Sequence, residues 1–191
     1  MSGNPTVEEL LQRNAQKARS HRPIPTLSEI SQQPPEQQVP MPKIFIVSCC
    51  DNRLDPFEIL GLEKWDAVVV RSCAGRIAPQ MSNLVFLDHV LQFTDVMIIH
   101  HTGHPAKSDH RIDCSAELFK NDHVRETLKE RAPAHSSAIN EFGLPGFDNL
   151  EQSIRDDVAL VHKSPLLRKE LAERTHGFVY DITTGKVTRV T

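Results

Sequence analysis

The stretch "AVVVRSCAGRIAPQMSNLVFLDHVLQFTDVMIIHH" (67–101) decides the fold, because it reads as a strand, a helix and a second strand in succession. "AVVVR" (67–71) and "VMIIHH" (96–101) are short, continuous apolar runs, as expected for strands that are covered on both faces. Between them, "PQMSNLVFLDHVLQF" (79–93) carries leucines at helical spacing, and Pro79 suits a first helical turn. A strand, a helix and a strand in this order predict a parallel crossover unit.

A third buried strand precedes this unit, and a hairpin follows it. "KIFIVS" (43–48) is again a short, continuous apolar run. The closing "GFVYDITTGKVTRV" (177–190) reads as a strand, a Thr-Gly turn and a second strand. Between the two, apolar residues at helical spacing predict a helix that opens at 148–151, and a second short helix is expected from Ser164 to about Arg174.

The N-terminal region differs from the rest of the chain in composition. Thr6 and Glu9 have the spacing of a capping box, which predicts a first amphipathic helix. Residues 21–42 then carry six of the thirteen prolines, so this segment is expected to be extended rather than helical. We therefore divide the chain into an N-terminal helix with a proline-rich arm, residues 1–42, and a single domain, residues 43–191.

The composition favours one cytoplasmic domain. The 191 residues carry a formal net charge of -3 and are 39% hydrophobic, which is enough for one core and too little for two. Lys and Arg are scattered rather than gathered with aromatic residues, so no nucleic-acid partner is expected. No apolar run approaches the roughly 20 residues that span a bilayer, so no membrane partner is expected. The N-terminal sequence has no apolar signal core, which predicts a cytoplasmic location.

Reactive residues gather where the three predicted parallel strands end. The strands run into "CCDNR" (49–53), "RSCAGR" (71–76) and "HHTGH" (100–104). In open α/β sheets, sites form in the crevice beyond these carboxyl ends. One Cys from the first segment with two His from the third is a plausible zinc set that leaves a fourth position for water. Asp51 and Arg53 can pair beside it, so that the aspartate accepts a hydrogen bond from this water.

These segments resemble the motifs of the β-class carbonic anhydrases. Residues 49–53 match the C-x-D-x-R motif of that family, "VVVRSCAGRI" (68–77) is similar to its V-x-R-N-A-G-G-R segment, and "IIHHTGHP" (98–105) is similar to its H-H-T-x-C-G. The closing hairpin also resembles the last hairpin of the family. The motifs occur in order and at family-like spacing over residues 43–104 and 148–190.

The resemblance implies a fold, an activity and an assembly. The expected fold is α/β, with a mostly parallel central sheet of about four strands flanked by helices and an antiparallel C-terminal edge strand. The expected activity is the zinc-dependent, reversible hydration of CO2 to bicarbonate. The resemblance further implies a homodimer or a higher homo-oligomer, in which the N-terminal helix embraces a neighbouring copy.

The same resemblance assigns roles to individual residues. The expected Zn2+ ligands are Cys49, His101 and His104. Asp51 is expected to orient the hydroxide that zinc provides, and Arg53 to hold Asp51 away from the metal. Ser72 and Gly75 are expected to line the substrate pocket.

The sequence departs from the family pattern at several of these positions. The family has a cysteine as third ligand where this chain has His104, and Cys114, supplied from the polar segment that follows, is the alternative ligand. The pocket wall also differs, since Ser72, Cys73 and Ala74 replace Asn, Ala and Gly of the motif.

The remaining cysteines and histidines carry less specific expectations. Cys50 and Cys73 are expected to be core thiols. His110 is expected to be an ordinary loop residue, and so is Cys114 where it does not serve as the alternative ligand. His100 is expected to lie behind the site, because neighbouring residues of a strand point to opposite faces.

Two other functions fit the departures from the motif. The chain could hydrolyse carbonyl sulfide or carbon disulfide on the same fold. It could also be a non-catalytic dimeric protein derived from the family, with a site that has lost its metal.

Overall fold

The computed structural model describes residues 3–102, 114–118 and 120–191, and it divides the chain into two compact units. The first unit ends at Pro40 and the second begins at Met41. None of the helices in the described ranges has the length and apolar character that a membrane crossing requires.

The first unit begins with α1 (Val7–Ala18), which starts at the predicted capping box. The Glu9 amide donates to the Thr6 hydroxyl (3.2 Å), and the Thr6 amide donates to the Glu9 carboxylate (2.7 Å). Within this unit the helix buries none of its residues, and its apolar side chains Val7, Leu10 and Leu11 are exposed. Its stability in this chain therefore depends on local interactions.

The proline-rich segment contains a helix, so the prediction that it is extended throughout was wrong. Thr26 and Glu29 make a second capping box, and α2 (Leu27–Ser31) forms between the prolines. The 3-10 helix η1 (Pro35–Gln37) follows. A capping box satisfies helix-end amides locally, which allows one helical turn in a segment where proline prevents a longer helix.

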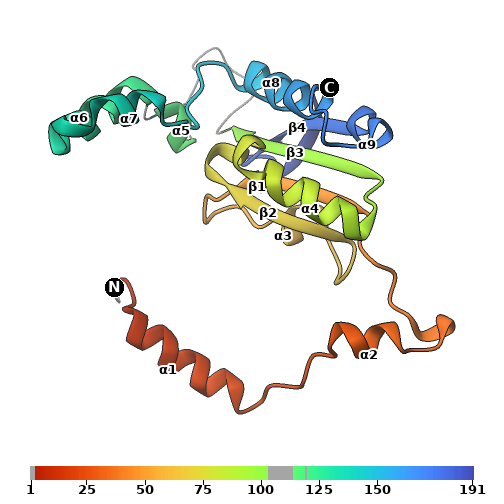
Figure 1. Ribbon diagram of the computed structural model, residues 1–191. Helices are drawn as coiled ribbons and strands as arrows, with labels where there is room; N and C mark the ends of the chain where they lie inside the picture. The colour runs from red at the N-terminus through yellow and green to blue at the C-terminus, as the bar shows by residue number, and fades with distance from the viewer. Residues whose placement is uncertain (1–2, 103–113, 119) are drawn as a thin grey trace. The chain divides into compact units, whose positions relative to one another are not determined.

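The second unit is built on a single five-stranded sheet (Figure 1). Its strands are β1 (Ile44–Cys49), β2 (Ala67–Ser72), β3 (Asp95–Thr102), β4 (Thr175–Asp181) and β5 (Lys186–Arg189). They lie in the order β2-β1-β3-β4-β5; the first four are parallel, and β5 pairs antiparallel with β4. This confirms the predicted α/β fold with an antiparallel C-terminal edge strand.

Helices of very different length connect these strands. The α-helices of this unit are α3 (Pro56–Leu60), α4 (Met81–Leu91), α5 (Ser115–Leu118), α6 (Asn121–Arg131), α7 (Ser136–Glu141), α8 (Leu150–His162) and α9 (Lys169–Glu173). The 3-10 helices are η2 (Cys73–Gly75), η3 (Ala78–Gln80) and η4 (Pro133–His135). α9 begins later than the predicted Ser164, because residues 165–167 form a turn.

The main core lies between the sheet and two helices, α4 and α8. Its buried members include Phe45 of β1, Ile98 of β3, Leu84 of α4 and Val158 of α8. α8 approaches the sheet closely at Gly177 of β4, where an added Cβ would clash with a methyl group of α8. The same helix therefore helps to fix the position of β4 and of β3, whose far end carries part of the site.

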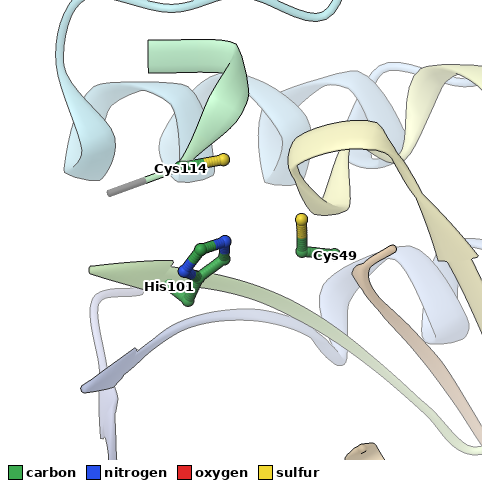
Figure 2. Close-up of side chains that lie close together, drawn as sticks. All are labelled: Cys49, His101 and Cys114. Carbon is green, nitrogen blue, oxygen red and sulfur yellow. The ribbon is translucent and has the colours of Figure 1, made fainter. Parts of the chain in front are cut away.

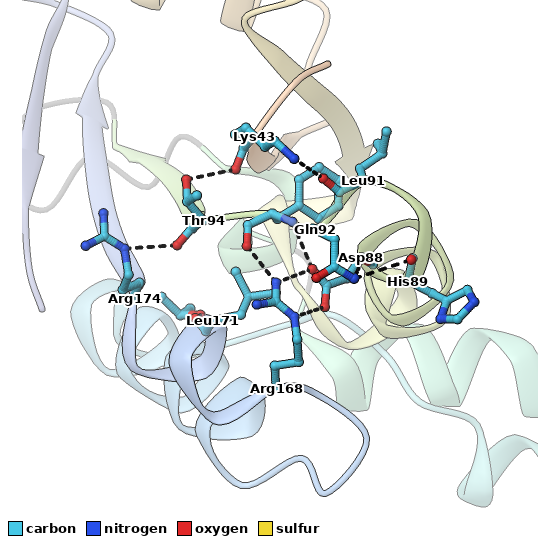
Figure 3. Close-up of polar contacts among 11 residues, drawn as sticks. Lys43, Asp88, His89, Leu91, Gln92, Thr94, Arg168, Leu171 and Arg174 are labelled. Atoms are coloured by element: carbon cyan, nitrogen blue, oxygen red, sulfur yellow. Dashed lines mark hydrogen bonds and ion pairs between the residues drawn. The ribbon is translucent and has the colours of Figure 1, made fainter. Parts of the chain in front are cut away.

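The amino-terminal end of the parallel strands is held by charged side chains that reach the backbone (Figure 3). Lys43, just before β1, donates to the Leu91 carbonyl at the end of α4 (2.6 Å). Arg174, just before β4, donates to the Thr94 carbonyl just before β3 (3.0 Å). The starts of β1, β3 and β4 are thus held by neighbouring segments, at the end of the sheet that lies opposite the site.

Arg168 completes this network. Its guanidinium donates to both carboxylate oxygens of the buried Asp88 (2.7 and 3.0 Å) and to the Phe93 carbonyl (2.7 Å). The hydrogen bonds and charge of Asp88 raise the pKa of Arg168. Asp88 also accepts from the Phe93 amide (2.9 Å), so one ion pair fixes the turn between α4 and β3.

Candidate metal centre

Three metal-ligating side chains meet at the carboxyl end of the sheet. Cys49 is the last residue of β1, His101 lies near the end of β3, and Cys114 directly precedes α5. Their ligand atoms all lie within 4.8 Å of one another, and all three residues are buried. Figure 2 shows the two sulfur atoms and the imidazole gathered around a common space. We call these three residues the Cys/His cluster.

The donors of the Cys/His cluster suit a zinc ion. Thiolates and imidazoles are preferred zinc ligands, and three protein ligands leave one tetrahedral position open. A hydrogen bond with the Cys114 thiol is the main cause that lowers the pKa of Cys49 to about 4, and the His101 ring lowers it further against the effect of burial. Cys49 is therefore stabilised as a thiolate, which is the form of cysteine that binds metals.

Asp51 and Arg53 form an ion pair beside the Cys/His cluster. Arg53 donates to the Asp51 carboxylate from Nε (3.0 Å), from Nη2 (2.6 Å) and from its backbone amide (2.9 Å). These hydrogen bonds lower the pKa of Asp51 to about 2, so the carboxylate is ionised at neutral pH. Asp51 Oδ2 lies 4.0 Å from His101 Nε2. The pairing that the sequence suggested is present, and its role toward a metal-bound water stays a prediction.

Arg71 of β2 positions the backbone that carries this ion pair. Its guanidinium donates to the carbonyls of Cys49 (3.0 Å), Asp51 (2.5 Å) and Leu54 (2.7 Å). One side chain therefore fixes both a ligand of the Cys/His cluster and the carboxylate beside it. Sequence reasoning missed this role, because an arginine at a strand end does not reveal which carbonyls it reaches.

His100 lies behind the cluster and connects β3 to α8, as the alternation of strand residues predicted. Its Nδ1 lies 3.0 Å from the Ser153 hydroxyl and its Nε2 lies 3.1 Å from the Asp157 carboxylate. Arg76 reaches the second oxygen of Asp157 at 3.0 Å. All of these groups except Arg76 are buried. The imidazole next to His101 is thus held by polar contacts on both ring nitrogens.

The two predicted pocket residues make close contacts within the protein. A Cβ at Gly75, whose φ is +74°, would lie 2.6 Å from the Ile99 carbonyl oxygen and 3.0 Å from His100 Cδ2. The Ser72 hydroxyl donates to the Arg76 carbonyl (2.7 Å). Gly75 therefore allows the turn after β2 to pack against β3, and a role of either residue toward a substrate stays a prediction.

For the third ligand, the sequence left His104 and Cys114 as alternatives. The structure brings Cys114 to Cys49 and His101. His104 and His110 lie outside the described residues. Cys114 could not be chosen from the sequence, because no periodic pattern indicates which residues of the polar segment lie near the strand ends.

Cys50 and Cys73 are exposed, so the prediction that they are core thiols was wrong. β1 ends at Cys49 and β2 ends at Ser72. The next residue of each chain segment therefore lies beyond the sheet, outside the layer that the helices cover. A run of apolar residues predicts a buried strand but does not say at which residue burial stops.

The mostly parallel sheet and the Cys/His cluster at its carboxyl end define an α/β domain with a candidate metal site. Comparison with known proteins identifies the family of this domain. Residues 44–187 match the family model described as carbonic anhydrase. The chain belongs to this family, and its relatives identify it as an enzyme of the β class, as its motifs predicted.

Individual relatives agree with this assignment. β-Carbonic anhydrase 1 of Mycobacterium tuberculosis is 26% identical over 157 residues, which cover 80% of this chain and 86% of that protein. The crystal structure of the Streptococcus mutans carbonic anhydrase has a TM-score of 0.73 at 26% identity and covers 100% of both chains. An apo carbon disulfide hydrolase has a TM-score of 0.63 at 15% identity over 97% of this chain and 92% of that one, which shows a shared fold alone.

Proposed function

We propose that this protein catalyses the reversible hydration of CO2 to bicarbonate at a zinc ion held by Cys49, His101 and Cys114. The observation that carries the proposal is the convergence of two buried thiols and an imidazole next to an ionised aspartate. Cys114 takes the place that the sequence interpretation gave to His104. Family membership supplies the reaction, and the Cys/His cluster supplies donors that suit the metal.

A zinc ion in this position would acidify a bound water and make it a nucleophile at neutral pH. The protein's own contribution begins with Asp51, which is ionised and can only accept hydrogen bonds. It can therefore accept a hydrogen bond from that water and orient its oxygen toward the carbon of CO2. Arg53 holds the carboxylate in place with hydrogen bonds from its backbone amide and its guanidinium, so that Asp51 does not turn freely.

Arg71 and Gly75 act on the same site through the backbone. Arg71 holds the carbonyls on either side of the reacting carboxylate, which limits movement of the loop between Cys49 and Leu54. Gly75 lets the following turn approach the Cys49 amide, since an added Cβ would lie 3.3 Å from that nitrogen. Both act as positioning residues in this proposal, and a contact of Gly75 with the substrate stays a prediction.

We further propose that copies of this chain associate. The support is apolar surface that is exposed in the single chain: Val7, Leu10 and Leu11 on α1, and Phe86 and Val90 on α4. Apolar side chains that gather on exposed helices are typical of interfaces. The cytoplasmic location rests on the N-terminal sequence and stays a prediction.

The test measures zinc content and CO2 hydration on the same preparations. Wild type is expected to hold one zinc ion per chain and to hydrate CO2 in a stopped-flow assay. Cys114→Ala is expected to lose zinc and activity, whereas His104→Ala keeps both. Zinc lost in His104→Ala and kept in Cys114→Ala would contradict the assignment of the third ligand.

The same preparations separate the alternative functions. Rates with CO2 and with carbonyl sulfide are compared on zinc-loaded wild type, and CO2 is expected to be the faster substrate. A faster reaction with carbonyl sulfide or carbon disulfide would assign the hydrolase function instead. Zinc-loaded protein that converts none of these substrates would identify a non-catalytic member of the family.

A further inference from the structure

Two thiols outside the Cys/His cluster lie at adjacent strand ends. Cys49 and Ser72 are the last register pair of β1 and β2, and the Cys50 amide donates to the Ser72 carbonyl (2.9 Å). Cys50 and Cys73 are thus the residues that directly follow two paired strand ends. Paired strands are about 5 Å apart, which is within the range of Cα separations that a disulfide spans.

The side chains of Cys50 and Cys73 also face each other. They share a hydrogen bond, and the Cys73 thiol has a second one with Ser115. Partial burial is the largest cause that raises the pKa of Cys73, and the thiols of Cys50 and Cys49 raise it further. Both residues are free and exposed, so an external reagent can reach them.

We propose that Cys50 and Cys73 form a reversible disulfide by exchange with an oxidised low-molecular-weight thiol, such as glutathione disulfide. One protein thiolate attacks a sulfur of the small disulfide, which gives a mixed disulfide and releases one small thiol. The second protein thiolate then attacks the protein sulfur of the mixed disulfide and releases the other small thiol. Two protein thiols are oxidised, one small disulfide is reduced, and the two protons of the cysteines end on the released thiols.

The position of this dithiol relative to the Cys/His cluster gives the oxidation a structural consequence. Cys50 follows the ligand Cys49, and Cys73 contacts Ser115, which follows the ligand Cys114. Cys73 also opens the turn in which Gly75 packs against β3. A bond between the two sulfur atoms would therefore join the backbone segments that carry the site, and its exposure makes it open to reduction again.

This inference does not depend on the proposed function. The bond is formed by two residues that belong neither to the Cys/His cluster nor to the Asp51–Arg53 pair. It requires only that the two thiols be adjacent and accessible, so it holds whichever substrate the site takes. Its test therefore reads the covalent state of the cysteines and not the activity.

Tryptic peptides of this sequence separate the cysteines in a useful way. Cleavage after Lys and Arg places Cys49 and Cys50 in peptide 44–53, Cys73 in peptide 72–76 and Cys114 in peptide 112–120. Zinc-supplemented, folded protein is equilibrated with mixtures of glutathione and glutathione disulfide. Free thiols are then blocked with iodoacetamide, and the digest is mapped by mass spectrometry.

The expected product is peptide 44–53 joined to peptide 72–76, with the mass of the pair reduced by two hydrogen atoms. The bond should disappear when excess glutathione is added. In Cys50→Ser the joined peptides should be absent, and Cys73 should carry glutathione instead. Cys73→Ser should leave Cys50 with glutathione in the same way, and a thermal melt shows that each variant is folded.

Three results would overturn the proposal. In the first, peptides 44–53 and 72–76 stay separate in oxidised, folded wild type, which shows that the thiols cannot bond. In the second, the peptides stay joined in Cys50→Ser, which assigns the bond to Cys49. In the third, peptide 44–53 joins peptide 112–120 instead, which means that the oxidant attacks the Cys/His cluster and not this dithiol.

Discussion

At the amino-terminal end of the parallel strands, Lys43, Arg168 and Arg174 each donate to a backbone carbonyl, and both arginines also pair with a carboxylate. At the carboxyl-terminal end, Arg53 donates to the carboxylate of Asp51. The first arrangement fixes chain turns, because each cation reaches the backbone of another segment. The second holds one ionised group next to the Cys/His cluster. Contacts at one end of the strands thus stabilise the fold, and side chains at the other end form the candidate site.

Arg71 shows that structural contacts are not confined to the amino-terminal end of the strands. It lies at the carboxyl-terminal end, yet it donates to three carbonyls as the cations of the opposite end do. A site needs a rigid backbone, so some residues next to it must do structural work. Variants at the amino-terminal end should therefore lose stability and keep activity, and variants of the Asp51–Arg53 pair should lose activity and keep stability. Only variants of the positioning residues should lose both.

The largest expected effect is the loss of stability in Gly75→Ala, because Gly75 lies in a turn that packs against β3 beside the site. The added methyl group would press on the Ile99 carbonyl, a backbone atom that cannot move independently, and φ is +74°. Left-handed strain and overpacking together are expected to cost about 3 to 4 kcal/mol of the free energy of unfolding, measured by urea denaturation.

The control is the neighbouring Ala74→Gly, which relieves a φ of +62° at an adjacent position. Its stability is expected to stay within about 1 kcal/mol of wild type, because relief of strain is offset by greater freedom of the unfolded chain. Equal stability of Gly75→Ala and wild type would contradict the close packing against β3.

The next effect, Asp51→Asn, should lower the CO2 hydration rate by roughly 10²- to 10³-fold while zinc content and melting temperature stay near wild type. Asn keeps the size of the side chain but loses the negative charge that Arg53 stabilises and that strengthens the hydrogen bond from the water. Glu151→Gln is the matched control, because it removes a carboxylate that pairs with Arg155 on the exposed face of α8. Full activity of Asp51→Asn would show that this carboxylate does not take part in the reaction.

Arg168→Met tests the opposite end of the sheet. It leaves the Asp88 carboxylate buried without its main partner, which is expected to cost about 2 kcal/mol of the free energy of unfolding. Zinc content per folded chain should not change. The matched control is the neighbouring Lys169→Met, whose exposed pair with Glu173 (3.7 Å) should contribute less than about 0.5 kcal/mol. Loss of zinc from folded Arg168→Met would show that the two ends are coupled.

The sequence was sufficient for the sheet and for the class of enzyme. Continuous apolar runs such as Val68–Val70 predict buried parallel strands without any knowledge of their partners. The C-x-D-x-R motif placed Cys49, Asp51 and Arg53 at a strand end, where the structure has them. These features are local, since each depends on residues within a few positions of one another.

What the sequence could not predict depends on contacts between distant segments. Cys114 lies beside Cys49 and His101 although it is distant from Cys49 in the sequence, and no short pattern predicts that contact. α2 was missed because the prolines were weighed more heavily than the Thr26–Glu29 capping box. The exposure of Cys50 depends on where β1 ends, which a sequence pattern does not define to within one residue.

The smallest effect concerns Asp181, where β4 reaches the carboxyl-terminal end but contributes no ligand. Hydrogen bonds from the Thr183 hydroxyl (2.7 Å) and amide (2.9 Å) and from the Thr184 hydroxyl (2.7 Å) lower the pKa of Asp181 to about 2. A carboxyl group in the unfolded chain has a pKa of about 3.9. The folded state thus binds the proton less readily, and the stabilisation is present above pH 4 and is lost as the pH falls toward 2.

Asp181→Asn should therefore reduce stability at pH 6 and reduce it less at pH 2.5. Both proteins are measured by urea denaturation with a chelator present, so that release of metal at low pH does not contribute. Asp51 also has a lowered pKa, but it is the same in both proteins, and the difference between them isolates Asp181. An equal difference at both pH values would mean that Asp181 holds the β4–β5 turn as a hydrogen-bond acceptor whose charge adds nothing. This carboxylate would then resemble the structural groups of the amino-terminal end, although it lies beside the site.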